Sequence, residues 1–104
     1  MNPWLLLTIA GLLEVAWALG LKYSDGFTKL VPSVLTLIGA TASFFILAQA
    51  MKTLPVGTAY AVWTGIGALG TAILAVFLFA EPVNAMRVVG ILLIVAGIAA
   101  LKLA

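Results

Sequence analysis

Glu14 is the residue of this sequence whose type and position most clearly suggest chemistry. It lies in the middle of the apolar stretch IAGLLEVAWALGLK, residues 9–22. A charged side chain at the centre of a membrane span costs about 2.5–3.5 kcal/mol, and such residues usually mark the path of an ion or substrate. A permanently protonated carboxyl group or a static ion pair are the structural alternatives. Because every Lys and Arg lies near the end of an apolar stretch, no basic residue shares the depth of Glu14, and we favour a functional carboxylate.

The composition of the chain is that of a membrane protein. Of its 104 residues, 65% are hydrophobic and only 8% are charged, whereas about 25% are charged in soluble domains. A hydrocarbon core of about 30 Å requires roughly 20 helical residues. The charged residues leave room for four such spans with short connections. We therefore expect one domain over residues 1–104, an all-α membrane protein with short transmembrane helices at about 3–21, 32–50, 56–79 and 84–102.

Composition also argues against several classes of protein. Cysteine and histidine are absent, which removes disulfides and most zinc sites, so we expect no metal and no cofactor. The first apolar stretch has no basic residue before it and contains a carboxylate. Both features argue against a cleavable signal peptide. A lone mid-membrane carboxylate makes no acid/base pair within one chain, so we do not expect an enzyme. The five basic residues serve mainly to anchor spans to headgroups, and we expect no nucleic acid partner.

The neighbours of Glu14 predict a pocket. Helical spacing places Gly11 and Ala18 on its side of the helix and Trp17 within one turn. Small residues let another helix or a ligand approach closely. Trp17 could donate its indole N–H to the carboxylate and hold a cation on its ring, or it could simply pack against lipid or core. A proton and a cation would compete for the one carboxylate, which is the arrangement that an exchanger requires.

The third apolar stretch, PVGTAYAVWTGIGALG, adds aromatic and glycine residues. Tyr60 and Trp63 lie one helical turn apart and share a face. Gly65 and Gly67 belong to a run of glycines, each costing about 1 kcal/mol against Ala in a helix. They predict a helix that bends or, alternatively, one that packs tightly. Ser43 in the second stretch is a lesser candidate, since its hydroxyl could equally bond its own backbone.

Basic residues are divided almost evenly between the two sides of the membrane. Lys52 and Lys102 fall on one side, and Lys22, Lys29 and Arg87 fall on the other. The positive-inside rule needs a bias to choose an orientation. Either the excess of one residue suffices, or the chain inserts both ways and assembles as an antiparallel, dual-topology homodimer.

A pair of glycines marks one stripe of the fourth stretch. Gly90 and Gly97 lie seven residues apart in GILLIVAG, two turns along the same face. Such a stripe is a plausible dimer interface, although glycine pairs are frequent in helix packing generally.

These residues together resemble the small multidrug resistance transporters over essentially the whole chain. The resemblance rests on four spans in 104 residues, Glu14 in the first, PVGTAYAVWTGIG in the third and the glycine-spaced fourth. GLLEVAW, and WTGIG rather than a serine after Trp63, look like the guanidinium-exporter branch, often called SugE-type. The resemblance implies an antiparallel homodimer in the bacterial plasma (inner) membrane. It would exchange protons for guanidinium, or close analogues such as guanylurea, by alternating access.

The resemblance also implies roles for individual residues. Proton or substrate would bind at Glu14, and the remaining pocket residues would be Gly11, Trp17, Ser43, Tyr60 and Trp63. The helix kink would fall at Gly65 to Gly67, and Gly90 and Gly97 would form the dimer interface. Ala40 lies at a portal where related exporters can carry a bulkier residue. The resemblance therefore leaves open whether the protein tolerates alkyl-tailed substrates.

Guanidinium fits the site on physical grounds as well. It is planar and remains charged at any cellular pH, and a carboxylate can accept it through two parallel hydrogen bonds. Three alternatives stay open: a broader exporter of quaternary ammonium and aromatic cations, a passive channel, or a non-transporting membrane subunit that uses Glu14 only for assembly.

Overall fold

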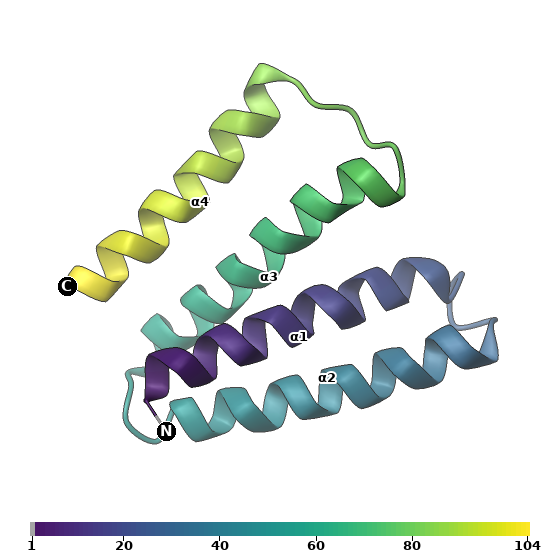
Figure 1. Ribbon diagram of the computed structural model, residues 1–104. Coiled ribbons are helices and arrows are strands. Elements are labelled where there is room, and N and C mark those ends of the chain that lie inside the picture. Colours follow the sequence, from purple (N-terminus) through teal and green to yellow (C-terminus); the bar gives the residue numbers. More distant parts are fainter. Residues whose placement is uncertain (1) are drawn as a thin grey trace.

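The computed structural model describes residues 2–104 and consists of four α-helices joined by short connections (Figure 1). Each helix is long and apolar enough to cross a membrane, which confirms the predicted all-α membrane protein. The helices are α1 (Pro3–Tyr23), α2 (Leu30–Ala50), α3 (Val56–Leu78) and α4 (Ala85–Leu103).

Two of the helices begin with an asparagine that caps them. The side chain of Asn2 accepts a hydrogen bond of 2.8 Å from the backbone N–H of Trp4, and Asn84 accepts one of 2.9 Å from Arg87. Each bond satisfies a backbone donor that the first turn of a helix leaves without a partner. Pro3 follows Asn2 at the first helical position, where its missing N–H costs nothing.

The turn between α1 and α2 is built on a buried serine. The hydroxyl of Ser24 donates to the carbonyl of Leu21 at 2.7 Å and accepts the backbone N–H of Phe27 at 3.1 Å. Asp25, Gly26 and Phe27 all have positive φ angles, between 50° and 69°. Glycine adopts this left-handed conformation without cost, and the serine bonds hold its two neighbours in it.

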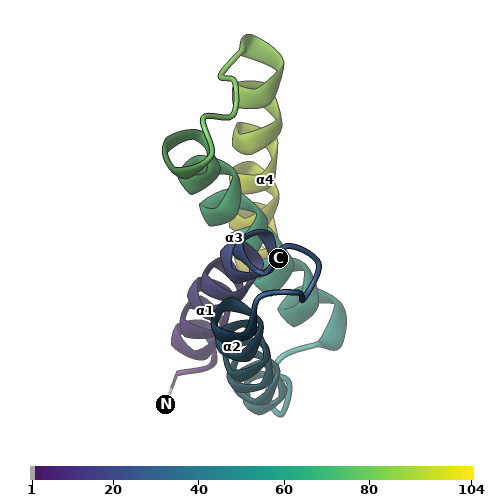
Figure 2. The ribbon, with the colours of Figure 1, turned by 90° about the vertical axis from the view of Figure 1, so that its right-hand side faces the viewer.

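Helix α1 lies at the centre of the arrangement and packs along both α2 and α3. Helices α2 and α3 contact each other little, whereas α4 packs along α3 on the side away from α1 and α2 (Figure 2). No residue of α4, all of which the structure describes, is buried. The protein therefore consists of a three-helix unit and one helix laid against its edge.

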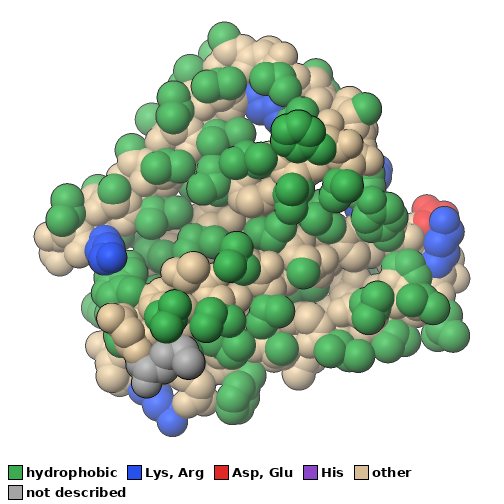
Figure 3. Space-filling view, viewed as in Figure 1, with side chains coloured by type: hydrophobic (Ala, Val, Ile, Leu, Met, Phe, Trp, Pro, Cys, Tyr) green, Lys and Arg blue, Asp and Glu red, His purple; other side chains and the backbone are tan. Residues whose placement is uncertain are grey.

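The surface matches a bilayer environment. Hydrophobic side chains cover most of the face shown in Figure 3, and the charged side chains lie at its margins. At opposite ends of the helices, Lys102 Nζ lies 5.5 Å from the ring centre of Trp4, and Lys22 Nζ lies 5.9 Å from that of Phe79. Aromatic and basic residues are the usual anchors at the membrane interface.

Glycines allow α1 and α3 to approach closely. A Cβ atom placed on Gly11 would lie 2.5 Å from Ile66 Cγ2, and one on Gly70 would lie 2.5 Å from Val15 Cγ2. Both distances are too short for real carbon atoms. Since lipid tails are as apolar as the helices, van der Waals packing of this kind is a main source of helix association in a membrane.

We expect Gly70→Ala to destabilise the fold by about 1–3 kcal/mol, because the added methyl group would overpack the contact with Val15. The measurement is the unfolding midpoint of the purified protein in detergent. Gly57→Ala is the matched control, since nothing lies within 4 Å of that position. Equal midpoints for the two variants would contradict the close packing of α1 and α3.

Candidate substrate and proton site

A chain of hydrogen bonds joins three helices next to Glu14. The indole Nε1 of Trp63 in α3 donates to the hydroxyl of Ser43 in α2 at 2.9 Å, and this hydroxyl donates to the carbonyl of Ala10 in α1 at 2.7 Å. Ser43 is fully buried and Trp63 is 4% exposed. In a regular α-helix the carbonyl of Ala10 also accepts the N–H of Glu14. The chain therefore reaches the backbone of the turn that carries the carboxylate.

The Glu14 side chain lies at the contact between α1 and α3. A Cβ atom on Gly67 would overlap its carboxyl group, so glycine at this position leaves the space that the carboxyl group occupies. Oε1 of Glu14 is buried and has no hydrogen-bond partner within residues 2–104. In the same described range, the ion pair joins Arg87 to Glu81 at 2.6 Å and does not involve Glu14. The geometry thus gives no support to a static ion pair. It leaves Oε1 of Glu14 free to accept a hydrogen bond or a proton.

Four aromatic rings follow one another beside this site. Trp63 lies between Tyr60 and Phe44, with both ring-centre distances 5.6 Å, and Phe44 is 6.1 Å from Trp17. Tyr60 is 56% exposed and Phe44 is 51% exposed. The buried ring of the hydrogen-bond chain, Trp63, is therefore flanked by two half-exposed rings, which can present their faces to a cation.

Trp17 does not make the hydrogen bond to Glu14 that its spacing suggested. Its Nε1 is buried and has no partner among the described residues. The side chain instead packs over Gly39 of α2, where a Cβ atom would lie 3.2 Å from Trp17 Cβ. Packing between helices directs the indole toward α2, and its N–H donor remains unused.

The two glycines predicted to form a kink have different neighbours. Gly65 faces α4, where an added Cβ would lie 2.9 Å from Ile98 Cδ1, whereas Gly67 faces Glu14. Helix α3 is continuous through both. Both therefore serve close packing here, and a bend at this point stays a prediction. Gly90 and Gly97 in α4 have open space beside them.

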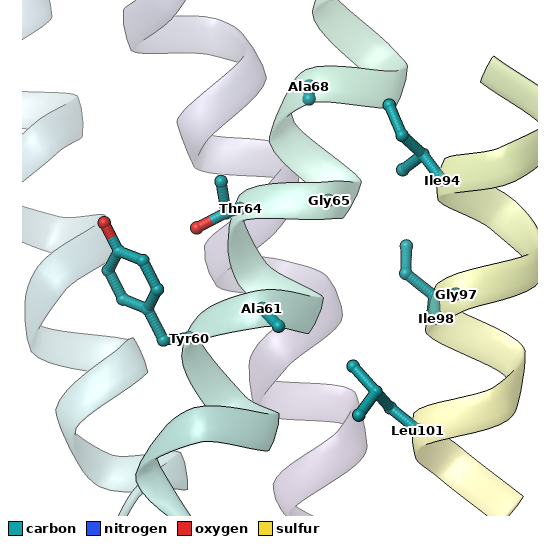
Figure 4. A pocket seen from close by; sticks show the side chains of 9 residues that line it. All are labelled: Tyr60, Ala61, Thr64, Gly65, Ala68, Ile94, Gly97, Ile98 and Leu101. Carbon is teal, nitrogen blue, oxygen red and sulfur yellow. The ribbon is translucent and has the colours of Figure 1, made fainter. Parts of the chain in front are cut away.

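An open groove of about 510 Å³ separates α3 from α4 (Figure 4). Gly65 lies on one wall and Gly97, Ile94 and Ile98 lie on the other, whereas the Tyr60 ring points away from α4. Its lining is almost entirely apolar and does not include Glu14. The groove thus shares Tyr60 with the row of rings but does not reach the carboxylate.

Sequence reasoning missed Phe44 and Gly39. Phe44 directly follows Ser43, and its place between two tryptophans depends on how α2 turns against α1 and α3. The signal for Phe44 was the aromatic pair SFF in an otherwise aliphatic stretch. Gly39 gave no signal beyond being a small residue.

The four apolar helices define a small multi-pass membrane protein that holds a carboxylate inside one of its spans. The family model described as Small Multidrug Resistance protein matches residues 2–94, and the chain belongs to this family. It is 61% identical over 101 residues to a protein of Yersinia pestis named Guanidinium exporter, covering 97% of each chain. It is 59% identical over 100 residues to a protein of the same name from Escherichia coli K12, covering 96% of this chain and 95% of the relative.

These comparisons confirm the resemblance seen in the sequence. They identify a transporter rather than an enzyme, and a multi-pass protein of the bacterial inner membrane.

We expect Ser43→Ala to lower the free energy of unfolding by about 1–3 kcal/mol, because the buried N–H of Trp63 would lose its acceptor. The measurement is the thermal midpoint in detergent, followed through tryptophan fluorescence. Ser33→Ala is the control, since Ser33 bonds the carbonyl of Lys29, the residue directly before its own helix. A Ser43→Ala variant as stable as Ser33→Ala would show that the chain between the helices contributes little.

Proposed function

We propose that this protein is a proton-coupled antiporter that exports guanidinium, and close analogues such as guanylurea, by alternating access. The observation that carries the proposal is the buried Oε1 of Glu14, which lies in a membrane span without a partner among the described residues. The name Guanidinium exporter, shared by relatives about 60% identical to this chain, supports the choice of substrate.

The free carboxylate supplies a physical reason for obligatory exchange. An ionised carboxylate in a low-dielectric interior is costly, whereas a bound proton or a bound cation neutralises it. The site therefore changes its accessibility more readily when it is loaded than when it is empty. Because guanidinium and the proton occupy the same carboxylate, one leaves when the other binds. Two copies in a homodimer would titrate as a coupled pair.

The residues around Glu14 either hold its helical turn in place or contact the bound cation. Ser43 and Trp63 hold the backbone of its turn through their hydrogen bonds. Tyr60 and Trp63 offer ring faces to the bound cation, and Trp17 offers an N–H without a partner in the described structure. Gly11 lets α3 approach on the turn before Glu14.

The assembly proposed is an antiparallel homodimer of chains inserted in both orientations. Its support comes from α4, which packs along α3 and buries none of its described residues. Gly90 and Gly97 leave open space on this helix, where a second copy can approach closely. The nearly even division of basic residues between the two sides of the membrane removes the usual reason for a single orientation.

The row of four rings favours a second candidate function, export of larger quaternary ammonium or aromatic cations. An aromatic cation could stack on Phe44 and Tyr60, both about half exposed. Competition between guanidinium and an aromatic cation for the same site separates the two functions. Strong binding of guanidinium with weak binding of the aromatic cation supports the first.

We expect Glu14→Gln to abolish guanidinium/proton exchange while leaving the protein folded, because a neutral amide has no charge to offer either ion. The measurement is guanidinium uptake into proteoliposomes driven by a pH gradient. In the wild-type protein, guanidinium binding should weaken as the pH falls, since protons compete for the same carboxylate. Asp25→Asn, in the exposed turn between α1 and α2, is the matched control and should transport normally. Proton-coupled uptake that persists in Glu14→Gln would refute the proposal.

Dual topology predicts that transport requires chains inserted in both orientations. The double variant Lys29→Ala, Thr53→Lys moves the basic excess to the side of the α2–α3 connection, and Lys52→Ala enlarges the excess on the other side. Each should insert mainly one way and lose most transport, whereas co-expression should restore it. Labelling in cells of a single cysteine introduced into a connection between helices would report the orientation. Full activity of either variant alone would contradict the antiparallel dimer.

A further inference from the structure

Thr71 in α3 carries a hydroxyl group that the fold itself does not use. Its Oγ1 is buried and has no hydrogen-bond partner in the described residues. Helical hydroxyl groups usually bond the carbonyl four residues earlier, as Thr8, Thr36 and Thr41 do here, at 2.8–3.0 Å. Buried polar atoms without a partner are rare, and each requires an explanation.

The register of α1 and α3 places this hydroxyl one turn beyond Glu14. The two helices run in the same direction (Figure 1), and successive contacts pair Gly11 with Ile66 and Glu14 with Gly67. The next contact pairs Val15 with Gly70, and one turn beyond Glu14 and Gly67 the helical repeat leads to Ala18 and Thr71. Four residues rise about 6 Å along a helix. Thr71, four residues after Gly67, therefore follows it along the side of α3 that contacts the carboxylate, and the residue one turn beyond Glu14 on α1, Ala18, has a small side chain.

Apart from Glu14, the buried side chains of the site offer few free acceptors, and the hydroxyl group of Tyr60 lies on a side chain that is 56% exposed. Guanidinium carries N–H donors on every edge, and a carboxylate satisfies one edge. The indoles of Trp17 and Trp63 are donors only. The hydroxyl of Ser43 already donates to Ala10 and accepts from Trp63. An N–H left unpaired in a buried site weakens binding, and Thr71 offers an unused acceptor on the face of α3 that Glu14 contacts.

We propose that Thr71 is a specificity-determining residue, whose hydroxyl accepts an N–H from a guanidinium ion held at its opposite edge by Glu14. The inference rests on the proposed function, since it requires guanidinium at that carboxylate. A proton bound to Glu14 stays on the carboxyl group and does not reach Thr71 one helical turn away. Thr71 therefore contacts the bound cation and not the bound proton. In an antiparallel pair, one Thr71 would lie on each side of the two carboxylates.

The test is Thr71→Val, which keeps the shape of the side chain and removes the hydroxyl. Guanidinium binding, measured by calorimetry on the full protein in detergent, should weaken by roughly ten- to hundredfold, the effect of one hydrogen bond from a charged donor. Thr71→Ser should restore it. The unfolding midpoint of the ligand-free variant should stay unchanged or rise, because a buried hydroxyl without a partner has been removed. A purely structural role predicts the opposite, a lower midpoint.

Thr41→Val is the matched control, since this hydroxyl bonds Leu37 within its own helix. It should bind guanidinium as the wild-type protein does. Wild-type affinity in Thr71→Val, a lowered midpoint, or no rescue by serine would each overturn the inference. Guanidinium exchange by the wild-type protein, lost in Glu14→Gln, would still uphold the proposed function in that event. Absence of exchange in the wild-type protein would overturn both.

Discussion

The cost of holding a carboxylate inside a membrane span is the constraint on which this structure depends. In a low-dielectric interior an ionised group without a partner is unfavourable, and yet Oε1 of Glu14 is buried without one among the described residues. Its neighbours hold the group without neutralising it. Gly67 leaves room for the carboxyl group, and the Trp63 to Ser43 to Ala10 chain ties its helical turn to two other helices. The folded protein therefore keeps a buried carboxylate oxygen without a partner, and a bound proton or cation would lower the cost of its charge.

Close packing keeps the helix that carries Glu14 in place. Glycines on α1 and on both of its neighbours contact larger side chains of the opposing helix, as in Gly20 against Thr36, Gly39 against Trp17 and Gly70 against Val15. Each such contact brings two backbones close and gains van der Waals energy in a solvent that offers little hydrophobic driving force. The three-helix unit is therefore a defined frame around the carboxylate.

Helix α4 is attached to α3 and takes no part in the contacts around Glu14. At the α3–α4 connection, Arg87 Nη2 bonds Glu81 at 2.6 Å and the carbonyl of Ala72 at 3.2 Å. Further along, the open apolar groove separates the two helices. The ionic site is complete without α4, since its contacts come from α1, α2 and α3. Under the proposed function, this division leaves α4 available for assembly while the first three helices bind the ion.

The sequence by itself determined the class of protein, the four spans and the presence of a carboxylate inside the first span. These properties follow from local hydropathy and from the cost of one charge in an apolar run, and neither depends on which helix faces which. The sequence left open whether Ser43 bonds its own backbone or another helix, and it suggested a Trp17 to Glu14 bond that the structure does not contain. The partners of Gly65 and Gly67, the row of rings through Phe44 and the unused hydroxyl of Thr71 were decided by tertiary structure alone. Each depends on how one helix turns about its axis against another, and that rotation is set by contacts between residues far apart in the chain.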